Sequence, residues 1–122
     1  MSDHGIEEFY DEPYTDSQIE TIFAKAMRGQ QLSALEIRQY KHAFLKVCAE
    51  MDYAADWTQQ YHYGAIRDNN TLMYNKLGAD TGFDSIGEFT TAKAMSSFLN
   101  ELNMEGKLTR TILYTLNHVP TR

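Results

Sequence analysis

Apolar side chains recur at helical spacing in two consecutive segments near the start of the chain. In the first, Ser17 and Glu20 fit the S-x-x-E capping box, in which a hydroxyl and a carboxylate satisfy free backbone N–H groups at a helix start. Gly29 is a typical helix stop. Between them, one helical face carries Ile19, Ile22, Phe23, Ala26 and Met27. The pattern predicts a helix from about Ser17 to Gly29.

A second capping box, Ser33 and Glu36, follows almost immediately, with Leu32 and Ile37 spaced as a hydrophobic staple. We expect its helix to run to about residue 55 and to form a helical hairpin with the first. Its predicted apolar face consists of Ile37, Tyr40, Phe44, Val47, Cys48 and Met51.

From Trp57 the period of the pattern changes to two, which is typical of a strand. One side of the predicted strand carries Gln60 and His62, and the other carries Trp57, Gln59, Tyr61 and Tyr63. The run "TRTILYTLN" near the end of the chain is rich in β-branched and aromatic residues. We therefore predict two short strands, at about 57–63 and 110–116.

The segment between the two predicted strands contains helical and loop patterns. Asn70 to Leu77 has the length of one or two helical turns and is followed by Gly78. The glycine- and aspartate-rich run "GADTGFDSIGEF" is predicted to be a loop. A third amphipathic helix is indicated by Ala92, Met95, Phe98, Leu99 and Leu102.

A strand, a loop with a helix, and a second strand form a βαβ unit, whose right-handed crossover places the two strands side by side in parallel. Parallel strands require cover on both faces, and two strands with three helices cannot supply it. We therefore expect an α/β fold that is a slice of a larger protein. Residues 1–56 would be a loop and helical hairpin, and residues 57–122 a strand-loop-helix-strand unit.

Composition narrows the function classes. Eleven Lys and Arg against seventeen Asp and Glu give a net charge of −6, which opposes binding to nucleic acid. No segment resembles a signal peptide or a membrane span. The single cysteine, Cys48, lies in a helical apolar pattern and suits a reducing compartment. These features predict a soluble cytoplasmic protein.

Polar groups collect where the predicted strands end, the usual place for ligands in parallel α/β folds. His62 and the loop after it lie at one such end, Asn117 at another, and Asp3 with His4 at a third if "SDHG" also ends a strand. Structural roles remain open for each of them. Arg67 could pair with Asp68, and Asp3 could be a turn residue. Helix capping and turn formation alone would account for Asn69, Asn70 and Thr71.

The run "QQYHYGAIRDNNTLMYNKLGADTGFDSIG" closely resembles the signature segment of the uronate isomerases, also called glucuronate isomerases. The opening "SDHGI" and the later "TILYTLN" resemble that family's flanking segments, in the same order. The resemblance thus covers nearly the whole chain. It implies a partial (β/α)8 TIM barrel of the amidohydrolase superfamily, whose members are several times longer than this chain.

The resemblance also implies an activity: isomerisation of D-glucuronate to D-fructuronate and of D-galacturonate to D-tagaturonate, assisted by a divalent metal, commonly zinc. Asp3, His62 and Arg67 match the family's catalytic positions, and His62 is also the candidate metal ligand. Gln60, Asn69 and Asn70, together with Arg67, are the expected substrate-binding residues. A hexuronate is the expected small-molecule partner, and a homo-oligomer stays open.

The chain departs from the family in lacking its H-x-H metal pair and its last metal-binding aspartate. We therefore expect the 122 residues alone to be inactive and to bind no metal tightly. Two other interpretations stay open: a metal-dependent hydrolase of the same superfamily, and a non-catalytic helical interaction module.

Overall fold

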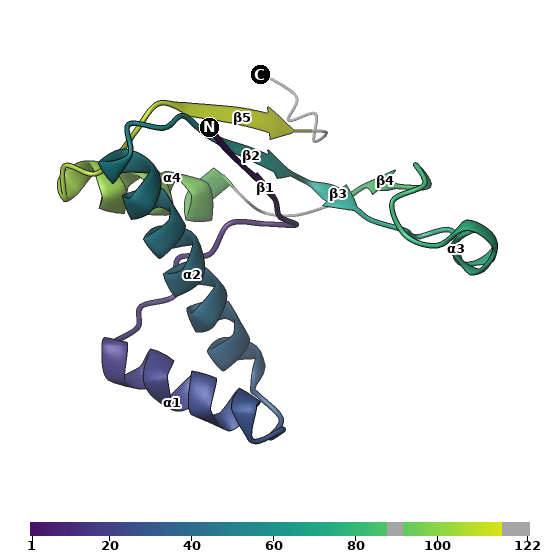
Figure 1. Ribbon diagram of the computed structural model, residues 1–122, viewed down its shortest axis with the longest axis horizontal. Helices are drawn as coiled ribbons and strands as arrows, with labels where there is room; N and C mark the ends of the chain where they lie inside the picture. The colour runs from purple at the N-terminus through teal and green to yellow at the C-terminus, as the bar shows by residue number, and fades with distance from the viewer. Residues whose placement is uncertain (88–91, 116–122) are drawn as a thin grey trace.

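Three parallel strands from distant parts of the chain form a sheet in the computed structural model (Figure 1). The structure describes residues 1–87 and 92–115. Within them the strands are β1 (Ser2–Gly5), β2 (Gln59–Tyr63), β3 (Ala65–Ile66), β4 (Ser85–Ile86) and β5 (Thr111–Thr115). The helices are α1 (Asp16–Met27), α2 (Ala34–Ala54), α3 (Thr71–Leu77) and α4 (Ala92–Met104).

The sheet has the strand order β1-β2-β5, with both pairings parallel. Gln60 lies opposite Asp3 on one side and Ile112 on the other. The predicted parallel pairing of the strands at about 57–63 and 110–116 is therefore confirmed, and "SDHG" is a third strand. Asn117 lies outside the described residues.

One face of the sheet packs on α2 and α4 (Figure 1). Phe9, Tyr61, Phe98 and Leu102 are almost completely buried there, and the Phe9 and Tyr61 rings meet edge to face at 5.2 Å. Each such side chain contributes about 1.5–3 kcal/mol by leaving water. None of the described helices covers the opposite face of the sheet. The polar strand residues on this open face are therefore accessible to solvent.

The predicted alternation of side chains between the two faces of β2 is confirmed, and it places a glutamine in the core. Gln59 is fully buried beside Tyr61. Its side-chain oxygen accepts from the Tyr61 hydroxyl at 2.9 Å, and its nitrogen donates to Thr111 Oγ1 at 2.8 Å. Because both ends of the amide are satisfied, its burial is tolerated and links β2 to β5.

The helical hairpin forms, but α1 starts at a different cap from the one predicted. Thr15 is the N-cap, and it forms a reciprocal capping box with Gln18. The predicted box of Ser17 and Glu20 is wrong. The chain just before the helix is anchored by Gln39, whose side chain donates to the Pro13 carbonyl at 2.9 Å, and this fixes an earlier helix start. The second box, Ser33 with Glu36, is confirmed.

The predicted apolar face of α2 is not the buried one. Phe44 and Met51 are 58% and 59% exposed, and Ile37 and Val47 are exposed as well. The predicted face is therefore wrong as a description of this structure. The buried side chains of α2 are instead mostly small or polar, with Leu45 as the large apolar one: Gln39, His42, Ala43, Leu45, Ala49 and Asp52.

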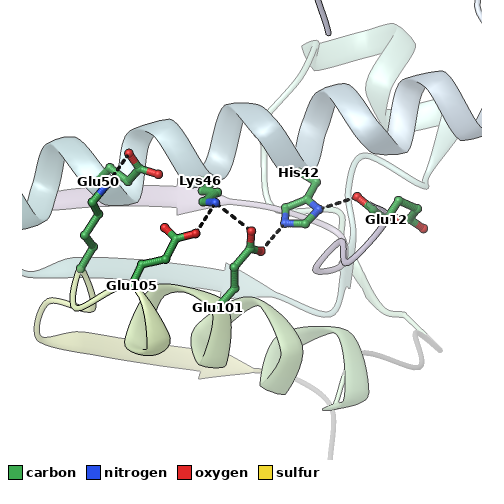
Figure 2. A network of polar contacts seen from close by, with 7 residues as sticks. Glu12, His42, Lys46, Glu50, Glu101 and Glu105 are labelled. Atoms are coloured by element: carbon green, nitrogen blue, oxygen red, sulfur yellow. Dashed lines mark hydrogen bonds and ion pairs between the residues drawn. The ribbon is translucent and has the colours of Figure 1, made fainter. Parts of the chain in front are cut away.

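Polar contacts explain this orientation of α2 (Figure 2). His42 Nδ1 lies 2.8 Å from the Glu12 carbonyl, and its Nε2 lies 2.9 Å from the Glu101 carboxylate on α4. Both oxygens accept, so the arrangement suits a ring with a proton on each nitrogen. Lys46 bridges Glu101 and Glu105, each at 2.8 Å. This network joins α2 to α4 and to the loop before α1.

The segment between β2 and α4 contains a β-hairpin of two short strands, β3 and β4, with α3 in the connection between them. β3 and β4 pair antiparallel, so a strand lies within the run predicted to be only loop. Gly64, with φ 86°, permits the turn between β2 and β3. The short helix predicted before Gly78 is confirmed as α3, which Asn70 caps. Among the described residues, no helix has the length and apolarity to cross a bilayer.

Candidate active site

Asp3 and His62 meet on the open face of the sheet. Their strands, β1 and β2, are neighbours, and the Asp3 Oδ1 atom lies 2.7 Å from His62 Nδ1. The two side chains are 56% and 43% exposed. The structure therefore brings together two of the three predicted catalytic residues in a position that a small ligand can reach.

The pairing fixes the chemistry of the histidine ring. An ionised Asp3 carboxylate can only accept, so His62 Nδ1 carries the proton between them. In the neutral ring, Nε2 then keeps its lone pair. A carboxylate in this position also fixes which ring nitrogen carries the proton. The pair is thus suited to accept a proton or to face an electron-poor centre through Nε2.

Tyr114 is a site residue that the sequence reasoning did not select. It lies opposite His62 in the pairing of β2 with β5. The two rings stack at 4.4 Å with an interplanar angle of 6°. The Tyr114 hydroxyl donates to the Gln60 side-chain oxygen at 2.8 Å. The alternating pattern of "TILYT" together with a parallel register was the signal that would have placed Tyr114 on this face.

Arg67 borders the same part of the surface. A depression of about 600 Å³ is lined by Arg67 and His62, together with Tyr63, Ala65, Leu113, Tyr114 and Thr115. This volume lies within the usual range of small-molecule sites. The guanidinium and imidazole groups therefore border one depression at the carboxyl ends of β2 and β5.

The ion-pair partner of Arg67 is Asp84, at 3.0 Å, so the suggested pairing with Asp68 is wrong. Asp68 adopts a left-handed conformation, and its carboxylate instead accepts from the Asp80 backbone N–H at 3.0 Å. The hydrogen bond from the Asp68 backbone is the main cause that lowers the pKa of Asp84 below its ordinary value; desolvation opposes it, and the hydrogen bond and charge of Arg67 add to the lowering. Asp84 therefore anchors Arg67 beside the depression.

Asn69 and Asn70 border a different depression, of about 530 Å³, with residues 82–85. Asn70 caps α3 by accepting from the Met73 N–H at 3.1 Å. Asn69 donates to Ser85 Oγ at 2.5 Å. Both side chains hold the hairpin and α3 together, and their role in substrate binding stays a prediction.

A complete metal site would require more donors than these residues provide. Across residues 1–87 and 92–115, no three His, Cys, Asp or Glu side chains are grouped closely enough to hold a metal ion. The pair of Asp3 and His62 supplies two donors, and these already bond to each other. The described residues alone do not fit a resident metal.

Comparison with known proteins gives a consistent result. The family model described as glucuronate isomerase matches residues 1–121. The chain is 63% identical over 117 residues to a uronate isomerase from Bacteroides thetaiotaomicron and 64% identical over 117 residues to one from Phocaeicola vulgatus. These matches cover 96% of this chain and 25% of each relative. The chain thus spans about a quarter of the length of these relatives.

The fold is also similar to a solved structure. The crystal structure of a uronate isomerase from Thermotoga maritima superposes with a TM-score of 0.83 at 30% identity. The match covers 95% of this chain and 26% of that one. The arrangement of strands and helices described above is therefore that of one segment of a larger protein.

Proposed function

Because this chain belongs to the glucuronate isomerase family, we propose that it forms part of an enzyme that interconverts hexuronates and the corresponding keto acids. The reactions are D-glucuronate to D-fructuronate and D-galacturonate to D-tagaturonate. The observation that carries the proposal is the pairing of Asp3 with His62 beside the depression that Arg67 borders.

The chemistry of an aldose–ketose isomerisation explains why these residue types are useful. A proton leaves C2 of the open-chain sugar, an enediol forms, and a proton is returned to C1. His62, held by Asp3, would face the reacting centre through Nε2, either as an acceptor for a substrate hydroxyl or as a metal ligand. Arg67 would offset negative charge on the substrate carboxylate or on the enediolate. Gln60, Asn69 and Asn70 would bind sugar hydroxyl groups.

The proposed architecture is a segment of a (β/α)8 barrel, with residues 1–122 forming one fragment of that domain. Three adjacent parallel strands, helices on one face only and polar side chains at the strand ends all agree with it. In a closed barrel the open face would point inward, so Asp3 and His62 would face the barrel interior. We also propose that the parent protein is cytoplasmic.

A divalent metal, zinc being the leading candidate, is proposed for the parent enzyme with His62 as one ligand. The other ligands would come from residues outside those described, since the described ones form no group of three donors. We assign no step of the reaction to the metal.

A chimera tests the function. The segment of the Bacteroides thetaiotaomicron relative that matches this chain over 117 residues would be replaced by the residues of this chain. We expect the full-length chimera to convert D-glucuronate to D-fructuronate, measured by the appearance of the ketose. A folded chimera that lacks this activity, beside an active parent enzyme, would contradict the proposal.

The chain alone provides the complementary test. Incubated with D-glucuronate and zinc, the 122 residues are expected to form no ketose above a control that contains zinc without protein. Turnover above that control would show that the chain is self-sufficient and would refute the expectation of inactivity.

A further inference from the structure

We propose that Tyr114 is a positioning residue that fixes the orientation of both His62 and Gln60 for the reaction. The inference deepens the function proposed above and rests on it. It starts from the two contacts that Tyr114 makes on the open face: the ring stack on His62 and the hydrogen bond to Gln60.

The first contact limits rotation of the His62 ring. Asp3 holds one edge of the imidazole through Nδ1 at 2.7 Å, and this bond alone leaves the ring free to swing about that edge. The Tyr114 ring lies flat against it, 4.4 Å away and within 6° of parallel. An edge contact and a face contact together define the plane of the ring, and hence the direction of the Nε2 lone pair.

The second contact fixes which way the Gln60 side-chain amide is oriented. An amide offers both an acceptor oxygen and two N–H donors. Because the Tyr114 hydroxyl donates to the Gln60 oxygen at 2.8 Å, the amide is left to present N–H donors to a ligand. Those donors suit the oxygens of a hexuronate, including a developing enediolate.

Tyr114 contributes little to the core. Its side chain belongs to β5 on the uncovered face, and the residue is 42% exposed. The residues that form the buried cluster, such as Tyr61 and Phe98, lie on the other face. Replacing Tyr114 should therefore change the geometry of the site much more than the stability of the fold.

Two substitutions separate the contacts. Tyr114→Phe keeps the ring and removes the hydroxyl, so it loses only the bond to Gln60. Tyr114→Leu removes the stack on His62 as well. Tyr53→Leu is the control, because Tyr53 is an exposed tyrosine of α2, 48% accessible, on another element.

The kinetic test uses the full-length chimera. Small misplacements of a catalytic group can cost up to about a hundredfold in rate, so we expect Tyr114→Leu to lower kcat by about ten- to a hundredfold. Tyr114→Phe should retain kcat within about threefold and raise KM, since it keeps the stack and loses the amide orientation. Equal kcat values for Tyr114→Leu and the unsubstituted chimera would overturn the proposal.

A spectroscopic test of the 122-residue chain is independent of activity. The facing tyrosine ring shifts the NMR resonances of the His62 ring protons. This shift should persist in Tyr114→Phe and in Tyr53→Leu, and should disappear in Tyr114→Leu. An unchanged His62 resonance in Tyr114→Leu would refute the positioning role. An inactive unsubstituted chimera with the expected resonance shifts would instead refute the proposed function and leave the ring contact established.

Discussion

At the scale of single residues, the candidate site depends on anchoring partners that lie outside the substrate-facing groups. Asp3 holds His62, Tyr114 stacks on it, and Asp84 holds Arg67. Asp3 and Tyr114 come from the strands on either side of β2, and Asp84 directly precedes β4 whereas Arg67 directly follows β3. Asp3, His62 and Arg67 are thus at least partly accessible to solvent, and each is held by a defined contact.

Arg67→Lys tests the role of the guanidinium. Lysine keeps the charge but loses the planar fork that binds a carboxylate through two bonds. In the full-length chimera we expect KM for D-glucuronate to rise about tenfold with a smaller change in kcat. The matched control is Arg110→Lys, because Arg110 is an exposed arginine that pairs with Asp56 at the amino end of the sheet. A KM that is equally unchanged in both variants would exclude Arg67 from substrate binding.

Residue type and strand-end position made Asp3, His62 and Arg67 candidates, and the resemblance to the uronate isomerases supplied their expected roles and added Gln60. Sequence reasoning missed Tyr114 and Asp84 because their importance comes from three-dimensional register and from a hairpin that only folding reveals. An aromatic residue in a strand looks like core until the covered face is known.

At the scale of elements, helix ends and the contact between α2 and α4 decide the arrangement. Two overlapping patterns, Thr15 with Gln18 and Ser17 with Glu20, both fit a capping box. Sequence alone could not choose between them, because the choice depends on where Gln39 and His42 anchor the preceding loop.

Substitutions at the two candidate caps distinguish the observed start of α1 from the predicted one. Thr15→Ala removes the hydroxyl that accepts from the Gln18 N–H, and should lower the free energy of unfolding by about 1 kcal/mol. Ser17→Ala, the control, should change it by less than about 0.5 kcal/mol. Urea denaturation measures both. A larger loss in Ser17→Ala than in Thr15→Ala would contradict the observed cap.

Glu101 is the central carboxylate of the network in Figure 2. It accepts from the nearly buried His42 and from Lys46. Glu101→Gln should lower the free energy of unfolding by about 1.5 kcal/mol. This is the lower end of the usual range for hydrogen bonds to charged groups, because a third of the Glu101 side chain is exposed. Glu105→Gln, which affects only the more exposed bond to Lys46, should cost less than about 0.5 kcal/mol.

The same network predicts the direction in which the stability of the fold changes with pH. Burial acts to raise the pKa of Glu101, but the hydrogen bonds from Lys46 and His42 outweigh it and hold the pKa below the ordinary 4.5. A carboxylate whose pKa is lower in the folded state than in the unfolded state stabilises the fold at pH values above its unfolded-state pKa. This stabilisation is lost as the pH falls through the folded-state pKa. Between about pH 5 and pH 3, stability should therefore decline less steeply in Glu101→Gln than in the wild type. Parallel curves would contradict the assignment.

At the scale of the whole molecule, two of the surfaces that expose large apolar side chains bear on association. One is the outer face of α2, with Phe44, Val47 and Met51, and the other is the open face of the sheet. Such patches usually mark contact with other protein. The helical periodicity of α2 predicted that this apolar face is buried, but nothing within the described residues covers it. The fold class could therefore be predicted from the sequence, whereas the buried face of α2 could not.

Self-association of the 122-residue chain is the expected result. Analytical ultracentrifugation should show a mass that rises with concentration, since exposed apolar surface and edge strands such as β1 favour association. The double substitution Phe44→Ser with Met51→Ser should shift the chain toward the monomer. Met104→Ser, at a residue 77% exposed near the end of α4, is the control. A wild-type chain that is monomeric at all concentrations would contradict this prediction.

The strand order β1-β2-β5 also has a consequence for how the chain folds. Asp3 and His62 are 59 positions apart, and Gln60 and Tyr114 are 54 apart, so neither of these two contacts is local. Closing such long loops costs entropy before the strands gain any pairing energy, so the sheet should form slowly. The α1–α2 hairpin can form earlier from short-range contacts. On an elongating chain, β1 would wait for β2 and then β5 to be synthesised, and the candidate site would be among the last features to form.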